Sequence, residues 1–228
     1  MTRLRYKDIE YTLRRSRRKT ASIYVERDGQ VSVLVPAELT GSQVEDLLEA
    51  KRKWIYTNQA VWRDLNATRV RREYVNGEGF LYLGRTYRLK LVAGQSVPLI
   101  LKDGYFCLRA DHGSPAAAFR EFYRQKGRRR IGQRVAFFQG RMGVHPRAVR
   151  IIELKNRWAS CSHDGNLNFH WKCMMAPPQV LDYIVVHELA HLFHPDHTQA
   201  FWNTVDKVLP TYQERKAWLR INGAGMDL

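Results

Sequence analysis

Residues 183–202, "YIVVHELAHLFHPDHTQAFW", carry the strongest chemical signal in this 228-residue chain. His187 and His191 are four positions apart, and Glu188 directly follows the first of them. Residues spaced by four lie on one face of an α-helix, so the two imidazoles can reach one metal ion. A carboxylate beside such a pair is placed to act on a water molecule at the metal. The pattern predicts an apolar helix that holds a metal site on one face.

Two further histidines, His194 and His197, compete for the third ligand position. Pro195 disfavours helical backbone in the residue before it, so the helix should end near His194. A helix that continued would place His194 about 10 Å along the axis from His187, too far for two ligands of one tetrahedral ion. His197 lies beyond the break, where the chain can turn back towards the metal. We therefore predict His197 as the third ligand, with His194 or Asp196 as the alternative.

Other interpretations of these residues need different partners. A closed structural zinc site would need a fourth protein ligand, for which Cys161 and Cys173 are the candidates, and it would leave Glu188 without a role. A thiol hydrolase that used Cys161 would need an ordered base, and the sequence places none beside it. Purely structural histidines are the simplest alternative, but two at helical spacing around a glutamate favour a metal site.

The N-terminal part of the chain has strong β-strand signals followed by one helix. Residues 9–35 contain two β-rich runs on either side of Asp28-Gly29, a dipeptide typical of hairpin turns. Residues 41–55 show helical spacing of apolar residues, and the helix should continue to about residue 65. Ser42 and Glu45 predict a capping box at its start.

The middle of the chain predicts more strands and a long helix. Residues 80–109 have the pattern of a β-meander, with turns at Gly84-Arg85 and Asp103-Gly104. Ser114-Pro115 predicts the start of a helix that runs to about Gln139.

The C-terminal part returns to β-structure and then becomes helical. Residues 149–173 contain strands, and apolar and polar residues alternate over 166–172, as in a strand with one buried face. We expect that strand to lie at a sheet edge, where an extended peptide could pair with it. Pro177-Pro178 opens the metal-binding helix, and two short helices should follow over 198–208 and 212–221.

Together these elements predict an α+β fold, in which a β-rich N-terminal part precedes a core of helices and strands. That core is zincin-like, because His187, Glu188 and His191 form the H-E-x-x-H pattern of zincins. We expect residues 1–112 to form the β-rich region with its helix and residues 113–228 to form the core, unless the two make one continuous domain. The sequence shows no internal repeat.

The charge balance favours contact with anionic partners. The chain has 38 Lys and Arg residues against 22 Asp and Glu residues, so its formal net charge is +16. Such an excess promotes binding to polyanions, including nucleic acid, although no zinc-finger spacing or RNA-binding motif is present. The clearest basic runs are Arg14–Lys19 and the helix after Ser114, where solvated surface is the simpler interpretation.

Cysteine content and hydropathy bear on the compartment. The three cysteines, Cys107, Cys161 and Cys173, form no C-x-x-C motif and do not suggest a disulfide framework, which fits a reducing environment. The N-terminal residues lack the apolar segment of a secretory signal, and no run of 18 apolar residues predicts a membrane span. We therefore expect a cytoplasmic protein without a membrane partner.

The segment "NRWASCSHDGNLNFHWKCMMAPPQVLDYIVVHELAHLFHPDHTQAFW", followed by "PTYQERKAWL", resembles the YgjP-like metallopeptidases, which are distantly related to SprT-like proteases. The resemblance is dense over residues 156–219 and weaker over "NGEGFLYLGRTYRLKL" upstream. It implies zinc on His187, His191 and His197, with Glu188 as the catalytic residue. Two positions depart from the family pattern: Ala159 stands where glycine is common, and "HPDHT" stands where an N-H-S form is common.

The resemblance and the motif together predict a zinc metalloprotease that hydrolyses peptide bonds in a peptide or protein substrate, with Glu188 as the general base. Arg157, His170 and Tyr212 are the candidates for stabilising the oxyanion. The alternative is a basic, nucleic-acid-associated protein with SprT-like protease activity or a vestigial zinc site. Metal analysis with Glu188→Gln separates the first hypothesis from salt-dependent nucleic-acid binding, which would mark the second.

Overall fold

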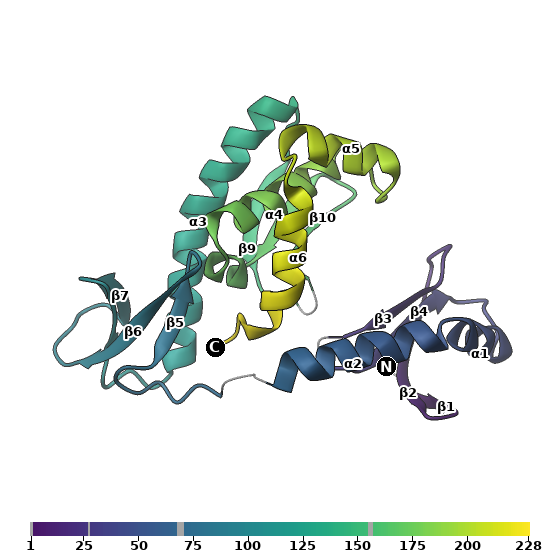
Figure 1. Ribbon diagram of the computed structural model, residues 1–228, viewed down its shortest axis with the longest axis horizontal. Coiled ribbons are helices and arrows are strands. Elements are labelled where there is room, and N and C mark those ends of the chain that lie inside the picture. Colours follow the sequence, from purple (N-terminus) through teal and green to yellow (C-terminus); the bar gives the residue numbers. More distant parts are fainter. Residues whose placement is uncertain (1, 27, 68–70, 155–156) are drawn as a thin grey trace. The chain divides into compact units, whose positions relative to one another are not determined.

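The computed structural model describes residues 2–26, 28–67, 71–154 and 157–228, and its α+β composition confirms the predicted fold class (Figure 1). The chain divides into two compact units, Met1–Val70 and Arg71–Leu228. The expected boundary between residues 112 and 113 falls inside the second unit. The strands before it share one apolar core with the helices after it, because Phe80 and Phe119 stack with their ring centroids 4.2 Å apart.

The first unit combines a four-stranded sheet with two helices. Its core contains Val33 from the sheet together with Val44, Leu48 and Ile55 from the helices, and all four are almost fully buried. The sheet has the strand order β1-β2-β4-β3. The elements are β1 (Thr2–Tyr6), β2 (Ile9–Ser16), β3 (Ser22–Val25), β4 (Val31–Pro36), α1 (Gly41–Ala50) and α2 (Arg52–Ala67). The hairpin between β3 and β4 turns at Gly29 with a φ of +83°, as its sequence predicts.

The predicted capping box lies two residues away from its actual position. Thr40 is the N-cap of α1, and its side chain accepts a hydrogen bond from the backbone of Gln43, whose side chain accepts one from the backbone of Thr40. The prediction of Ser42 and Glu45 was therefore wrong, because Thr40 and Gln43 have the same spacing and satisfy the first free N–H groups. The expected continuous helix is also interrupted at Lys51, where α1 ends and α2 begins.

The second unit begins with another four-stranded sheet, in which the expected meander does not form. The strands are β5 (Gly79–Tyr82), β6 (Arg85–Val92), β7 (Leu99–Lys102) and β8 (Tyr105–Arg109), in the order β5-β6-β8-β7. In a meander each strand would pair with the next, whereas here β6 pairs with β8 in parallel. The two turns were predicted correctly: Gly84 and Gly104 have positive φ angles of +76° and +78°.

The two sheets repeat one topology, which the sequence did not reveal. Each consists of two antiparallel hairpins, and the second strand of the first hairpin pairs in parallel with the second strand of the other hairpin. The orders β1-β2-β4-β3 and β5-β6-β8-β7 therefore correspond strand by strand. The sequence shows no internal repeat, so the correspondence is one of topology alone. Sequence self-similarity does not show it because strand pairing constrains burial and turns rather than residue identity.

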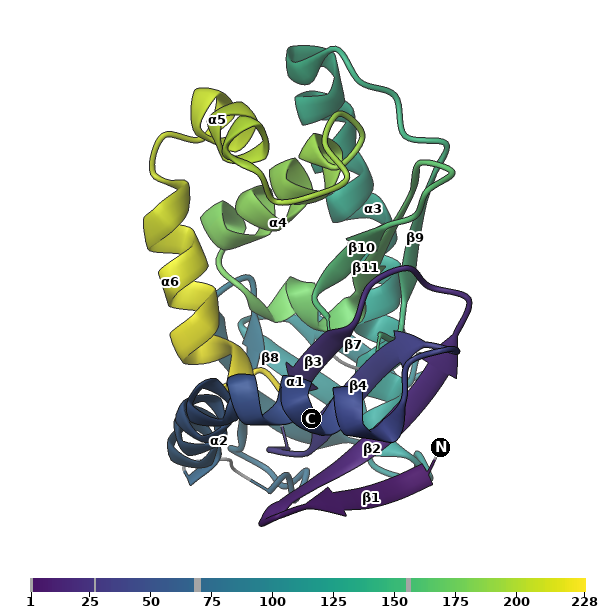
Figure 2. The same ribbon diagram turned by 90° about the vertical axis from the view of Figure 1, so that its right-hand side faces the viewer.

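The rest of the second unit packs helices around a three-stranded sheet. Figure 2 shows α4 between α3 and α6, and α4 also contacts α5 and β10. The small sheet has the order β10-β11-β9, so β11 is its central strand. Its strands are β9 (Ala148–Ile152), β10 (Ala159–Cys161) and β11 (Asn166–His170). The helices are α3 (Pro115–Met142), η1 (Trp171–Met175), α4 (Pro178–Ala190), α5 (Gln199–Val208), α6 (Tyr212–Asn222) and η2 (Gly223–Gly225).

The expectation that the 166–172 strand is a sheet edge was wrong. β11 pairs with β10 on one side and with β9 on the other, so it has no free edge for another strand. The alternation of apolar and polar residues along β11 shows only that one face of the strand is buried. A central strand and an edge strand can both have such a pattern. The strand beside α4 at the sheet edge is β10.

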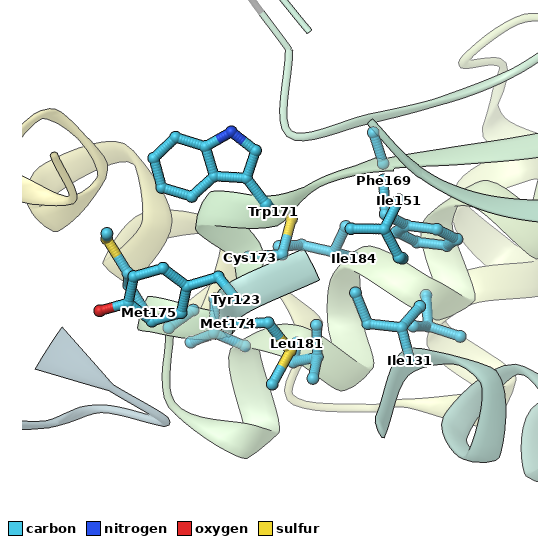
Figure 3. Packing of buried hydrophobic residues seen from close by; sticks show 14 of the residues in the cluster. Tyr123, Ile131, Ile151, Phe169, Trp171, Cys173, Met174, Met175, Leu181 and Ile184 are labelled. Carbon is cyan, nitrogen blue, oxygen red and sulfur yellow. The ribbon is translucent and has the colours of Figure 1, made fainter. Parts of the chain in front are cut away.

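The core beneath α4 is continuous from α3 through η1, as Figure 3 shows for Ile131, Ile151, Met174 and Ile184. Gly127 allows this close approach, because a Cβ at that position would lie 3.3 Å from a methyl carbon of Ile151. Among the helices of the described residues, none has both the length and the apolar character that a bilayer crossing requires.

Candidate metal centre

The helix α4 provides a rigid base for the predicted site. Nine of its thirteen residues are buried. The apolar side chains of the helix are distributed around its axis and do not form a single stripe. The helix ends at Ala190, and His191 forms its C-cap, so the chain leaves the helix before Pro195. His187 therefore lies on the last turn of α4 and His191 directly at its end.

The structure brings His187, His191 and His197 together. One ring nitrogen from each lies within 4.8 Å of those of the other two. The Nε2 atoms of His187 and His197 are 3.0 Å apart. Two nitrogens at about 2.0–2.1 Å from a shared tetrahedral ion would be about 3.3 Å apart, so the observed separation is close to that of two ligands. No other cluster of three His, Cys, Asp or Glu residues with this geometry occurs in the part of the chain that the structure describes.

A backbone contact orients His191. Its Nδ1 lies 3.0 Å from the carbonyl oxygen of His194, which accepts a hydrogen bond when Nδ1 carries the proton. The Nε2 atom is then the free donor atom, as in metal sites where a second contact sets the imidazole tautomer. The side chain of His194 points elsewhere, because its Nε2 lies 3.1 Å from the hydroxyl of Thr204. His194 therefore helps to position a ligand through its backbone and does not join the cluster.

Phe201 lies against all three imidazoles, a contact that the sequence pattern does not predict. Its ring centroid is 4.9 Å from that of His187, 4.7 Å from that of His191 and 4.8 Å from that of His197. Phe201 is fully buried near the start of α5. The side chain of Thr198, the N-cap of α5, accepts a hydrogen bond from the backbone of Phe201. In the sequence, a threonine directly after His197 is the signal that could have predicted a helix start here, and with it the position of Phe201.

The surroundings favour the neutral form of His187 and His197. Burial lowers the pKa of His187 to about 3, and the charges of His191, His197 and Lys216 act in the same direction. Burial also lowers the pKa of His197, together with the charges of His191 and Lys216. Neutral imidazole is the form that binds a metal ion, so for these two residues the lowered pKa agrees with the geometry of the cluster.

Glu188 is buried beside the cluster with one oxygen atom unsatisfied. Only 5% of its surface is exposed, and within the described residues its Oε2 has no hydrogen-bond partner. Burial raises the pKa of Glu188 to about 8, although the charge of Arg157 and a backbone hydrogen bond with Cys161 act in the opposite direction. A buried carboxyl group with one unsatisfied oxygen is costly, so its retention next to three imidazoles indicates a chemical role.

The donor set fits a divalent metal ion. Three imidazoles converge, one of them is held by a backbone carbonyl, and a carboxylate lies outside the cluster of ligand atoms. Three protein ligands would leave a coordination position open, which is the pattern of catalytic sites. The alternative of a closed site finds no support. Cys173 is fully buried, and its thiol donates to the carbonyl of Trp158.

The other residues considered for the site have different surroundings. Cys161 contacts the carbonyl of Ser162, and burial raises the pKa of its thiol, with the charge of Glu188 adding to the effect, so it is a poor thiolate nucleophile. Asp196 is exposed and outside the cluster. The ring of His170 is buried, and its Nδ1 accepts the backbone N–H of Lys172 at the start of η1.

The remaining two candidates for stabilising the oxyanion lie near the site. The charge of Arg157 acts on Glu188, which places it within electrostatic reach of that carboxylate. Tyr212 stacks on Trp202 with ring centroids 5.3 Å apart, and Trp202 in turn stacks on His197 at 5.6 Å. Both residues are thus linked to the cluster, Arg157 through Glu188 and Tyr212 through Trp202.

The chain is similar to known proteins to different extents. No curated protein matches the chain. A crystal structure of the metallopeptidase zymogen of Pyrococcus abyssi abylysin is 27% identical over 41% of this chain and 92% of that chain, with a TM-score of 0.37. The family model described as "YgjP-like, metallopeptidase domain" matches residues 19–222, which include every residue of the cluster. The chain therefore belongs to the YgjP-like metallopeptidase family.

Proposed function

We propose that this chain is a zinc-dependent peptidase in which His187, His191 and His197 hold the ion and Glu188 is the general base. The observation that carries the proposal is the convergence of three imidazole nitrogens within 4.8 Å beside a buried carboxylate that has an unsatisfied oxygen. Imidazole ligands at tetrahedral spacing favour zinc over the hard cations that prefer oxygen ligands. All four residues belong to the second unit, so we propose that Arg71–Leu228 contains the catalytic core.

The protein residues divide the work of hydrolysis between them. When bound, zinc supplies Lewis acidity, which polarises the scissile carbonyl and lowers the pKa of water. Glu188 accepts the proton of the attacking water on its free oxygen and then donates it to the leaving amine. Arg157 or Tyr212 would stabilise the negative charge on the carbonyl oxygen, whereas the contacts of His170 hold it in the start of η1.

The outer edge of β10 is a suitable place for the substrate backbone. β10 pairs only with β11 in the described sheet, and a backbone hydrogen bond joins Cys161 at its end to Glu188. An extended peptide that added to this edge would lie beside the general base, with its main chain fixed by ladder hydrogen bonds. This position replaces the one expected on β11, whose two sides are already paired.

The proposal is tested by metal analysis together with one substitution. Purified protein should contain one zinc ion per chain and cleave an unfolded protein substrate. Glu188→Gln should keep the zinc and lower kcat by about 100- to 10,000-fold, because the change removes proton transfer while preserving shape. Glu214→Gln changes an exposed carboxylate on α6 and serves as the matched control. Full activity of Glu188→Gln, or protein that takes up no divalent ion, would exclude this mechanism.

A basic surface on α3 supports a second, compatible role in polyanion binding. The helix carries eight Arg and Lys residues and one Glu. Phe137 is 45% exposed and lies between the guanidinium groups of Arg134 and Arg141, at 4.6 and 5.2 Å from its ring centroid. The exposed cations of this helix suit the phosphate groups of a nucleic acid strand. Affinity for a single-stranded oligonucleotide that falls steeply with salt and is lost in Lys126→Gln with Arg129→Gln would support this role.

A cytoplasmic location completes the proposal. All three cysteines are free thiols, and two of them are only partly buried. Free, accessible thiols are typical of proteins in a reducing compartment.

A further inference from the structure

A groove on α6 begins next to the metal cluster and is not used by the mechanism above. It is a cavity of about 530 Å³, and it is lined by Trp202, Tyr212, Gln213, Lys216, Arg220 and Ile221 among others. Trp202 connects it to the cluster, since its ring centroid lies 5.6 Å from that of His197 and 5.8 Å from that of His187. The groove therefore lies beside the cluster.

Two cations follow one another along this groove. Tyr212, Lys216 and Arg220 are spaced by four residues, so they lie in one row on α6. Four residues of helix rise about 6 Å. Two residues of an extended peptide advance about 6.6 Å and carry side chains on the same face. The cations on α6 thus match the spacing of alternate side chains on an extended chain laid along the helix.

Both cations are available for a ligand. Lys216 and Arg220 are exposed, and neither has an ion-pair partner among the residues that the structure describes. Lys216 is held in place by Trp202, because its Nζ lies 4.0 Å from the centre of the indole ring. Glu214 is the one acidic residue of α6, and it does not line the groove.

We propose that the α6 groove selects peptide substrates that carry carboxylates at alternate positions on one side of the scissile bond. This inference rests on the proposed peptidase function and names the substrate class for that site. Lys216 would pair with the carboxylate nearer the cluster and Arg220 with the one two residues further away. A side-chain carboxylate and the free C-terminus of a short substrate present the same chemistry to these cations.

An acidic peptide suits this groove better than a nucleic acid strand. Binding of single strands depends on aromatic faces that are free to stack on bases. The rings at this end are already stacked on each other, with Trp202 against Tyr212 at 14° between planes and against His197 at 21°. Lys216 covers the same indole ring. The groove thus offers cations with little free aromatic surface.

The test uses binding, so that it does not depend on turnover. The protein is the zinc-loaded Glu188→Gln variant, and the probes are fluorescent peptides that contain Glu-Ala-Glu or Gln-Ala-Gln, each with a free or an amidated C-terminus. The Glu-Ala-Glu peptides should bind tighter. Lys216→Gln and Arg220→Gln should each weaken their binding about twofold to fivefold, and the double variant about tenfold, as expected for exposed charge pairs.

Arg215→Gln is the matched control, because Arg215 lies on the same helix and does not line the groove. It should leave the preference for Glu-Ala-Glu unchanged. The amidated peptides separate the two sources: a preference that survives amidation belongs to the side chains, and one that disappears belongs to the C-terminus. Equal affinity for the glutamate and glutamine peptides, or equal losses in Arg215→Gln, would overturn the inference.

Two further readouts complete the test. Zinc content is measured on the same samples. Protein that binds acidic peptides but contains no zinc would contradict the proposed peptidase function and would leave the inference about the groove intact. A single-stranded oligonucleotide that depends on Lys216 and Arg220 for binding, while the peptides do not, would overturn the substrate class. In the active enzyme, Lys216→Gln should raise KM for acidic substrates with little change in kcat.

Discussion

The Nδ1 atom of His191 lies 3.0 Å from the carbonyl oxygen of His194, so a backbone group beyond the end of α4 orients a side chain at the end of that helix. The contact links the helix to the loop that brings His197 back to the cluster. His194 therefore contributes its carbonyl, which every residue has, rather than its imidazole.

The two histidines of the loop should respond differently to removal. His197→Ala should lower zinc affinity by at least about 100-fold, because it removes one of three ligands, a larger loss than an outer contact causes. His194→Ala should bind zinc nearly as well as the native chain, since its carbonyl stays in place. Competition with a chromophoric chelator measures both. If His194→Ala lost more zinc affinity than His197→Ala, His197 would not be the third ligand.

Phe201 should affect stability and metal binding together. Phe201→Ala should lower the free energy of unfolding of the second unit by about 3–5 kcal/mol, because it removes a fully buried ring from the core. It should also weaken zinc binding, since all three imidazoles pack on that ring. Phe137→Ala, at an exposed ring, is the control and should change stability by less than about 1 kcal/mol. Urea titration and zinc competition distinguish these outcomes.

Gly84 should tolerate a methyl group poorly. Its φ is +76°, and a Cβ would lie 2.8 Å from Cγ of Pro177 and 2.9 Å from its Cα. Gly84→Ala should therefore cost about 1–2 kcal/mol of backbone strain and a further 1–3 kcal/mol of steric overlap. Gly104 has nearly the same φ with no atom within 4 Å of its Cβ position, so Gly104→Ala should show the strain alone. Thermal unfolding measures both variants. Equal losses of stability in Gly84→Ala and Gly104→Ala would show that the contact with Pro177 adds nothing.

The pair of Arg134 and Asp182 should stabilise the packing of α3 on α4. The guanidinium donates to both carboxylate oxygens, at 2.6 and 3.0 Å, and both side chains are largely buried. Asp182→Asn should lower the free energy of unfolding by about 1–3 kcal/mol, because it weakens a bidentate pair and leaves a buried charge without its partner. The exposed pair of Arg128 and Glu121 is the comparison, and Glu121→Gln should have almost no effect.

Removal of the metal should lower both activity and stability. A chelator should abolish peptidase activity, and one equivalent of zinc should restore it. At zinc 1,000 times above its Kd, the bound ion should contribute about 4 kcal/mol to the free energy of unfolding. Melting curves with and without chelator measure this difference. The Glu188→Gln variant should show the same shift as the native chain, because the substitution leaves the ligands in place.

Local signals in the sequence indicated which histidines the fold brings together. The spacing of His187 and His191 indicated a shared helical face, and Pro195 indicated a break that lets His197 return; the structure brings these three together. Phe201 and the carbonyl of His194 were not predicted, because a buried phenylalanine and a backbone group have no distinctive pattern. Their roles depend on how the loop folds back, which is a property of tertiary structure.

Pairing between distant strands was the main part of the fold that the sequence did not reveal. Turns at Gly29, Gly84 and Gly104 follow from local chemistry and were found where expected. The parallel pairing of β6 with β8 and the central position of β11 depend on which edges meet in space. Alternation of apolar residues shows which face of a strand is buried and not which neighbour it has.

The burial of α4 on all sides has a consequence for how this enzyme can diversify. The H-E-x-x-H residues that we propose for catalysis stand on or at the end of a helix that tolerates few substitutions, because almost every change there also disturbs the core. The outer row of α6 faces solvent and can accept many side chains at little energetic cost. Because the catalytic helix is buried and the α6 row is exposed, related enzymes can change substrate preference through surface substitutions while their hydrolytic chemistry stays constant.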